Sequence, residues 1–248
     1  MARIALLLLS LQRTFLCFHA TIQARTRKAG GGMELEAGKA FRLEETNPAV
    51  AGCTVSQQIA GGRNPLWIFS LGKGTDISGE LYPYHKLLLV QEGQLKVRAD
   101  RAETVLEPGQ CFLAPTDVPV GMEALTDTVY TELEIQKEDI MNNAVEAGKA
   151  FRLADLVPYQ EGRIVNMDVV HNDKMKFVVM AFAAGTGLSE HAAPGDALIF
   201  ALEGEGVIGY EGKAHTLKAG EQFRFAKNGL HWVKAEKPFK MGLLLTLE

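Results

Sequence analysis

The chain has 248 residues, of which 47% are hydrophobic and 23% charged, an ordinary balance for a globular protein. No apolar run approaches the roughly 20 residues that a membrane-spanning helix needs, so we expect no transmembrane segment. The formal net charge is −4, but the first 32 residues carry five basic groups and no acidic one. The remainder therefore has 21 basic against 30 acidic groups, a net charge of −9 that excludes a basic surface for nucleic acid.

Residues 1–32 differ in composition from the rest of the chain. Residues 4–11 are apolar and follow Arg3, as in a secretory signal, and the acid-free stretch up to Lys28 is similar to a transit peptide. Arg13 interrupts the apolar run, and no small-residue cleavage site follows it. We interpret residues 1–32 as a disordered N-terminal extension, with Met33 as the working start of the protein.

Several motifs that would define a site are absent from the sequence. The cysteines follow no metal or redox spacing, and an odd, scattered set favours a cytoplasmic protein over one with a disulfide framework. The Gly-rich turns carry no Gly-Lys-Ser/Thr and precede no helical pattern, so they are not phosphate loops. There is no nucleophile elbow, which leaves covalent hydrolysis without support. The three cysteines are Cys17, Cys53 and Cys111.

An internal repeat decides the domain organisation. The eight residues EAGKAFRL occur at Glu36 to Leu43 and again, unchanged, at Glu146 to Leu153, 110 residues later. Residues 87–93 (LLLVQEG) and 198–204 (LIFALEG) continue the similarity at an offset of 111. Self-similarity at one fixed offset indicates two copies of one unit. We therefore predict an N-terminal domain at residues 33–142 and a C-terminal domain at residues 143–248.

Each copy has the pattern of a small all-β domain. Apolar runs of strand length recur between Gly-rich turns spaced 8 to 12 residues apart, as in a sandwich or barrel. In chain order the predicted strands are 67–71, 87–93, 94–98, 177–182, 197–202 and 207–210. Helix signals are weak, and we leave residues 137–147 as either a short helix or a linker.

The glycine spacing resembles that of the cupin superfamily, whose two motifs are G(x)5HxH(x)3,4E(x)6G and G(x)5PxG(x)2H(x)3N. The second copy matches this spacing, and the first copy keeps the same frame. The resemblance covers nearly all of residues 33–248 and implies two tandem jelly-roll (double-stranded β-helix) barrels that form a pseudo-dimer. We expect the two EAGKAFRL segments to pair across its interface. The matching positions of the second copy are Gly185, His191, Ala193, Ala197, Gly204, Gly220 and His231.

The family's metal ligands are three histidines and one glutamate, and the second copy keeps only His191 and His231. Alanines occupy the other two positions, and a stable first-row metal site usually needs at least three protein ligands. Asp196, one residue from the glutamate position, is the predicted third ligand, with His171 and His215 as alternatives. The resemblance thus implies either one divalent transition metal (Zn, Fe, Mn or Ni) in the second barrel or none.

The first copy has no usable set of metal ligands. Glu80, Tyr82, Lys86 and Val120 occupy its four ligand positions, a combination that cannot bind a transition metal in the usual way. His85 lies outside these positions, in the place that corresponds to Asp196. We interpret this barrel as structural.

Two functions remain open from the sequence. One is a bicupin that binds a small molecule at a partly degenerate metal or ligand site in the second barrel. The other is a metal-dependent enzyme, an oxygenase or isomerase, that acts on a small organic or carbohydrate-like substrate. Whether the protein is an enzyme is left undecided. We expect no nucleic-acid or membrane partner, and we leave a homodimer open.

Overall fold

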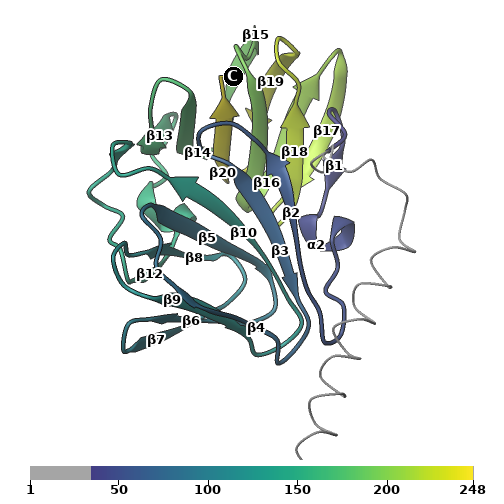
Figure 1. Ribbon diagram of the computed structural model, residues 1–248. Helices are drawn as coiled ribbons and strands as arrows, with labels where there is room; N and C mark the ends of the chain where they lie inside the picture. Colours follow the sequence, from purple (N-terminus) through teal and green to yellow (C-terminus); the bar gives the residue numbers. More distant parts are fainter. Residues whose placement is uncertain (1–34, 248) are drawn as a thin grey trace, which may run out of the picture.

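The computed structural model describes residues 35–247 and shows an almost entirely β-stranded protein. Figure 1 shows two barrels, the first drawn in blue and teal and the second in green and yellow. The sequence-based prediction of two all-β jelly-roll barrels is confirmed. The prediction for residues 1–32 concerns a segment outside the described residues.

The first barrel is formed by two facing sheets. A six-stranded sheet has the order β12-β8-β5-β10-β3-β2, in which β12 is Ala150–Arg152, and a four-stranded sheet has the order β4-β9-β6-β7. Alternate residues of each strand point into a core that includes Leu88, Phe112, Met122 and Tyr130. The strands are β2 (Thr54–Ala60), β3 (Leu66–Leu71), β4 (Asp76–Glu80), β5 (His85–Glu92), β6 (Leu95–Ala99), β7 (Ala102–Leu106), β8 (Gln110–Ala114), β9 (Val120–Ala124) and β10 (Thr128–Ile135).

In the second barrel one long strand, β16, joins both sheets. Its first half pairs with β18 and β20, and its second half pairs with β17 and β19. The interior is dense with aromatic rings, among them Phe182, Phe223, Phe225 and Phe239. The strands are β13 (Ile164–His171), β14 (Met175–Phe182), β15 (Thr186–Ala192), β16 (Asp196–Tyr210), β17 (Lys213–Lys218), β18 (Gln222–Phe225), β19 (Leu230–Ala235) and β20 (Phe239–Thr246).

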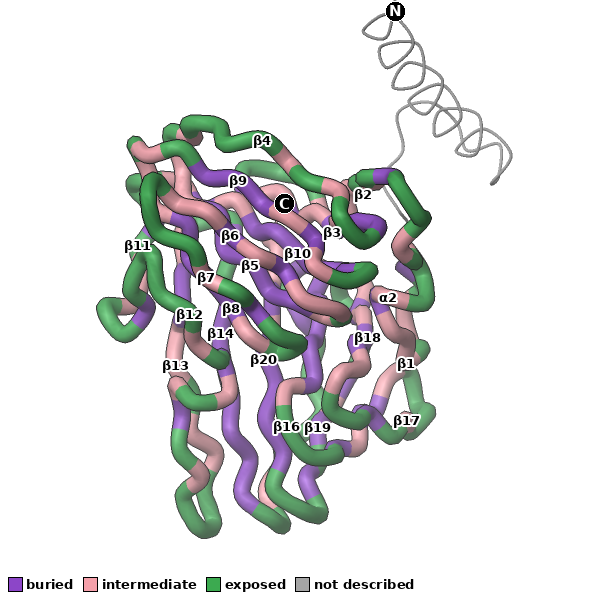
Figure 2. The backbone as a smooth tube through the Cα atoms, turned by 90° about the horizontal axis from the view of Figure 1, so that it is seen from below, coloured by how far each residue is buried: buried purple, intermediate pink, exposed green. Residues whose placement is uncertain are grey.

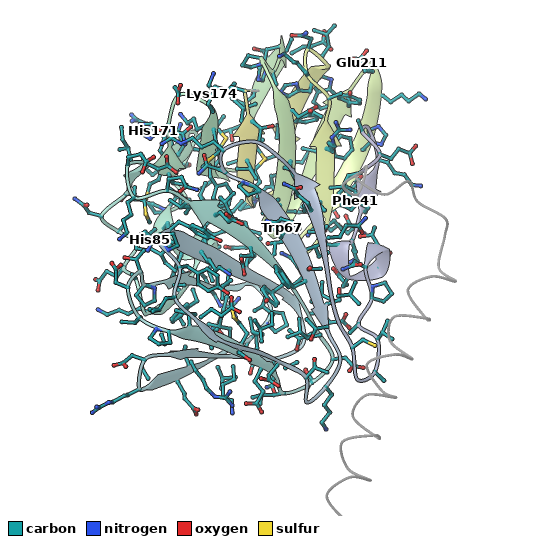
Figure 3. All side chains as sticks on the ribbon, viewed as in Figure 1. Phe41, Trp67, His85, His171, Lys174 and Glu211 are labelled. Atoms are coloured by element: carbon teal, nitrogen blue, oxygen red, sulfur yellow. The ribbon has the colours of Figure 1, made fainter. Side chains whose placement is uncertain are left out.

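The repeated EAGKAFRL segments exchange between the barrels. The first forms β1 (Ala40–Phe41) and pairs with β18 of the second barrel; the second forms β12 (Ala150–Arg152) and pairs with β8 of the first. Each segment then leads into one helical turn, α2 (Leu43–Thr46) or the 3-10 helix η1 (Leu153–Leu156). Figure 3 shows Phe41 beside the strands of the second barrel. The two identical segments thus occupy equivalent places at opposite barrels.

An apolar layer between the barrels joins them into one body. Strands β3, β5 and β10 contribute one side of this layer, and β14, β16 and β20 contribute the other. Leu133 and Leu87 of the first barrel share one buried cluster with Phe177, Phe200 and Leu244 of the second. In Figure 2, buried backbone runs along β5, β10, β14 and β20. Burial of this layer holds the two barrels together.

The segment between the copies forms turns and a short strand rather than a helix. Within residues 137–147 the only regular element is β11 (Ile140–Met141), which pairs with β13. The buried Asp139 carboxylate accepts hydrogen bonds from the Gln136 backbone N–H at 2.8 Å and from Asn64 at 2.7 Å. These tertiary bonds fix a turn where the sequence has little helix propensity, so the linker alternative is correct.

Within residues 35–247, no helix is both long enough and apolar enough to cross a membrane.

Candidate functional site

His191 and His231 lie side by side on the second barrel, at the end where β15 and β19 pair, which we call its mouth. His191 is on β15 and His231 on β19, and the two residues are direct cross-strand partners. The centroids of their rings are 4.3 Å apart, with an angle of 54° between the planes. His191 is exposed, whereas only 5% of His231 is exposed. The structure thus brings together the two histidines that the sequence singles out.

Both imidazoles are held by the backbone. Nδ1 of His191 is 2.8 Å from the carbonyl oxygen of Ser189, and Nδ1 of His231 is 2.9 Å from that of Gly229. A carbonyl oxygen only accepts hydrogen bonds, so each Nδ1 carries the proton, and Nε2 of the neutral ring is an acceptor. Burial, and secondarily the neighbouring His191, lower the pKa of His231 against the opposing effect of the Gly229 bond. His231 is therefore neutral at pH 7.

Two aromatic residues, Tyr210 and Phe225, complete this end of the barrel. Tyr210 lies opposite His231 in the register between β16 and β19. The Phe225 ring stacks on His231 with centroids 4.0 Å apart and on Tyr210 with centroids 5.5 Å apart. The alternation of residues 207–210 placed Tyr210 on a strand, but its partner strand could not be known. Trp232, the next residue along β19, packs over Gly209.

The predicted third ligand is engaged elsewhere. Oδ1 of Asp196 accepts hydrogen bonds from Nη2 of Arg224 and from the Lys227 backbone N–H, both at 3.0 Å. His171 lies on β13, 3.8 Å from Asp168, and the His215 ring packs on Phe223 with centroids 5.2 Å apart. The structure therefore shows none of the three predicted additional ligands together with the histidine pair.

The residues at this mouth do not fit a three-ligand transition-metal centre. Among residues 35–247, no three His, Cys, Asp or Glu side chains are arranged to hold a metal ion. Ala193 and Ala197, which occupy the family's remaining ligand positions, are buried and offer no donor atom. What the mouth does present is a pair of imidazoles next to the Phe225 ring, an arrangement that suits hydrogen bonding to a small organic molecule.

The corresponding positions of the first barrel form a polar cluster. Lys86 is buried and makes an ion pair with Glu132, and its Nζ lies 3.4 Å from the centroid of the Tyr82 ring. The Tyr82 hydroxyl donates to Oε2 of Glu80 at 2.9 Å, while Val120 is buried in the apolar core. Sequence reasoning missed Glu132, which is 46 positions from Lys86 along the chain and is identified only by the pairing of β5 with β10.

Comparison with known proteins agrees with this architecture. Residues 178–246 match the family described as Cupin domain. A cupin 2 conserved barrel domain protein from Leptotrichia buccalis is 27% identical, with a TM-score of 0.76, and the match covers 87% of this chain and all of that one. No match was found among curated proteins.

A mutant of Bacillus subtilis oxalate decarboxylase is 10% identical, with a TM-score of 0.50 and a match over 87% of this chain and 78% of that one. Identity this low shows the fold alone. The Leptotrichia buccalis match extends over both barrels, because they make up nearly all of the described chain. The second barrel thus matches the Cupin domain family over residues 178–246, and the described chain as a whole has the two-barrel fold of the similar Leptotrichia buccalis protein.

Proposed function

We propose that this protein is a small-molecule-binding bicupin whose ligand site is the mouth of the second barrel. The observation that carries the proposal is the opposed pair of imidazoles, 4.3 Å apart, each with Nδ1 bound to a backbone carbonyl. Such fixed rings direct Nε2 lone pairs as hydrogen-bond acceptors. The ligand is a small organic molecule with hydroxyl or amine donors for these atoms and an apolar part for the surrounding surface.

The apolar surroundings support this class of ligand. Phe225 stacks against His231, and Ala193 and Ala197 are small where a metal-binding cupin has ligand side chains. Ligand sites of this kind combine mostly apolar walls with a few convergent polar groups. Because His231 is buried and neutral, its Nε2 accepts a hydrogen bond without bringing a charge into the site.

The second candidate is the metal-dependent enzyme of the oxygenase or isomerase class. One observation favours it: a histidine that binds metal through one ring nitrogen usually donates from the other to a carbonyl or carboxylate, as both histidines do here. The missing third protein ligand disfavours it, since Asp196 is engaged with Arg224. The binding protein is therefore the better-supported function.

One experiment on the full chain, purified without chelators, distinguishes the two candidate functions. Wild type, the double variant His191→Ala/His231→Ala and the surface control His171→Ala are compared by elemental analysis and by mass spectrometry of molecules released on denaturation. We expect metal well below one equivalent in all three proteins, and a bound molecule in wild type and His171→Ala but not in the double variant. Stoichiometric Fe, Mn, Zn or Ni that is lost only in the double variant would establish the enzyme candidate instead.

A protein that loses its endogenous ligand on purification is tested by ligand-observed NMR with a set of hydroxyl- and amine-bearing fragments. Fragments that bind the second-barrel mouth should lose saturation transfer in the double variant and keep it in His171→Ala. If no fragment distinguishes the double variant from wild type and no molecule is released from wild type, the proposal is wrong.

A further inference from the structure

The interior of the first barrel contains a buried ion pair under a tyrosine ring. The Lys86 Nζ lies 2.9 Å from Oε1 of Glu132, and the two side chains are only 8% and 3% exposed. The Tyr82 ring covers this ammonium group at 3.4 Å and is itself tied to Glu80 through its hydroxyl. Buried charges are rare unless they are paired, and a buried ion pair is weak evidence of stabilisation. The presence of this ion pair inside the barrel therefore calls for an explanation.

Two oxygen atoms in this cluster are buried without a hydrogen-bond partner. They are the hydroxyl oxygen of Tyr130 and Oε2 of Glu132. The two residues are on β10 two positions apart, so both side chains point to the same face of the sheet, into the barrel. The Tyr130 ring stacks on Phe69 with centroids 5.1 Å apart, which fixes the direction of its hydroxyl. An unsatisfied buried polar atom is costly, and here there are two on one wall.

The two unpartnered atoms define the chemistry of what would satisfy them. The Tyr130 hydroxyl offers a proton, and Oε2 of the Glu132 carboxylate can only accept one. A single hydroxyl group can accept from the first and donate to the second. Lys86 and Glu132 cancel in charge, so a further buried ion of either sign would be uncompensated, while Glu80 at the rim disfavours an anion further.

We propose that the first barrel, interpreted from sequence as structural, is a second binding site that takes a small uncharged polyhydroxyl molecule under Tyr82. One hydroxyl of the ligand bridges Tyr130 and Glu132, and Lys86 holds the Glu132 carboxylate in place. The site does not depend on the histidine pair: His85, next to Lys86, and Glu211, whose carboxylate binds the Leu230 backbone beside His231, lie well apart in Figure 3.

The decisive variant is Tyr130→Phe, which removes one oxygen atom and keeps the ring that stacks on Phe69. A hydroxyl that is simply buried and unpaired is dispensable, and its removal leaves stability unchanged or slightly higher. A hydroxyl that binds a ligand cannot be removed without loss of affinity. The full-length protein is titrated with glycerol, xylitol and glucose, and binding is followed by saturation-transfer NMR. The control is His171→Gln, which lies outside both candidate sites, and His231→Gln reports binding at the second barrel.

We expect at least one of the three probes to bind wild type and His171→Gln equally, and to bind Tyr130→Phe about tenfold more weakly, the effect of one lost hydrogen bond. Equal binding to wild type and Tyr130→Phe would overturn the proposal. So would binding of acetate or methylammonium in preference to all three polyols. A crystal structure with only a single water between Tyr130 and Glu132 in the presence of the probes would also overturn it. Loss of binding in His231→Gln alone would place the polyol at the second barrel instead.

Discussion

Lys86 and Glu132 form an ion pair inside the first barrel, with Nζ and Oε1 2.9 Å apart and both side chains shielded from solvent. Lys86→Met leaves a buried carboxylate without its cation, and we expect a loss of about 3–5 kcal/mol in the free energy of unfolding at pH 8. The double variant Lys86→Met/Glu132→Leu, which buries no charge, should be more stable than either single variant. Urea denaturation of wild type, the two single variants and the double variant measures these free energies of unfolding. A double variant whose loss of stability equals the sum of the two single losses would contradict the prediction.

The cost of Lys86→Met should also depend on pH. Burial raises the pKa of Glu132 even with Lys86 present, and without the lysine the main opposing influence is gone. A carboxyl group with a raised folded pKa is most favourable below its unfolded pKa and loses stability as the pH rises through the folded value. Lys86→Met should therefore be less destabilised relative to wild type at pH 5 than at pH 8. An equal loss at both pH values would show that Glu132 stays ionised.

Gln222 ties the exchanged segment to the second barrel. Its side chain is 1% exposed, its Oε1 accepts from the Leu43 backbone N–H at 2.9 Å, and its Nε2 donates to Gln91 at 3.0 Å. Gln222→Ala leaves the Leu43 N–H without an acceptor, so we expect a loss of about 1–3 kcal/mol and faster hydrogen exchange at that amide. Gln91→Ala is the control, because the Gln222 amide keeps Gly220 as an acceptor. Unchanged exchange at Leu43 in Gln222→Ala would contradict this role.

The fold was predictable because its signals are local or repeated. Strand-length apolar runs and the duplicated EAGKAFRL segment are visible in the sequence, and the pairing of Phe41 with Gln222 has its counterpart in the pairing of Phe151 with Cys111. The sequence also predicted that these segments pair across the interface between the barrels, but the strands that they join, β18 and β8, became visible only in the structure. Strand exchange leaves the residue pattern unchanged, because each segment meets an equivalent strand in either barrel.

The candidate sites were less predictable because they depend on side-chain direction. His191 and His231 were identified from motif spacing, and their contact follows from the pairing of β15 with β19. The role of Asp196 depends on Arg224, 28 positions away, whose guanidinium group donates a hydrogen bond to the Asp196 carboxylate. Likewise, Lys86 looks in the sequence only like a lost metal ligand; its buried partner becomes visible once β5 and β10 are placed side by side.

Gly209 and Trp232 are cross-strand partners, and the indole ring lies over the glycine so closely that a Cβ there would overlap it. Gly209→Ala should therefore cost about 1–3 kcal/mol through overpacking. In a Trp232→Ala background the same change has no ring to displace, so the cost should largely vanish. Thermal or urea denaturation of the two single variants and the double variant measures the coupling. Additive losses would mean that the backbone, rather than the ring, resists the substitution.

Protonation of His231 should destabilise the protein. Burial holds the pKa of this histidine below its ordinary value of 6.5, so the unfolded chain binds its proton more readily than the folded chain does. The stabilising contribution of neutral His231 is complete above about pH 6.5 and declines as the pH falls toward the lowered folded value. Protonation would also place a charge next to His191 and against the Phe225 ring.

The test is urea denaturation at pH 7.5 and pH 5.5 for wild type, His231→Gln and the surface control His171→Gln. Glutamine does not titrate, so the difference in unfolding free energy between the two pH values should shrink in His231→Gln and persist in His171→Gln. His231→Gln should also be less stable at pH 7.5 by about 0.5–1.5 kcal/mol, because the stacking on Phe225 is lost. A pH dependence equal to that of wild type in His231→Gln would mean that protonation of His231 is not linked to folding, and that the imidazole is solvated rather than buried.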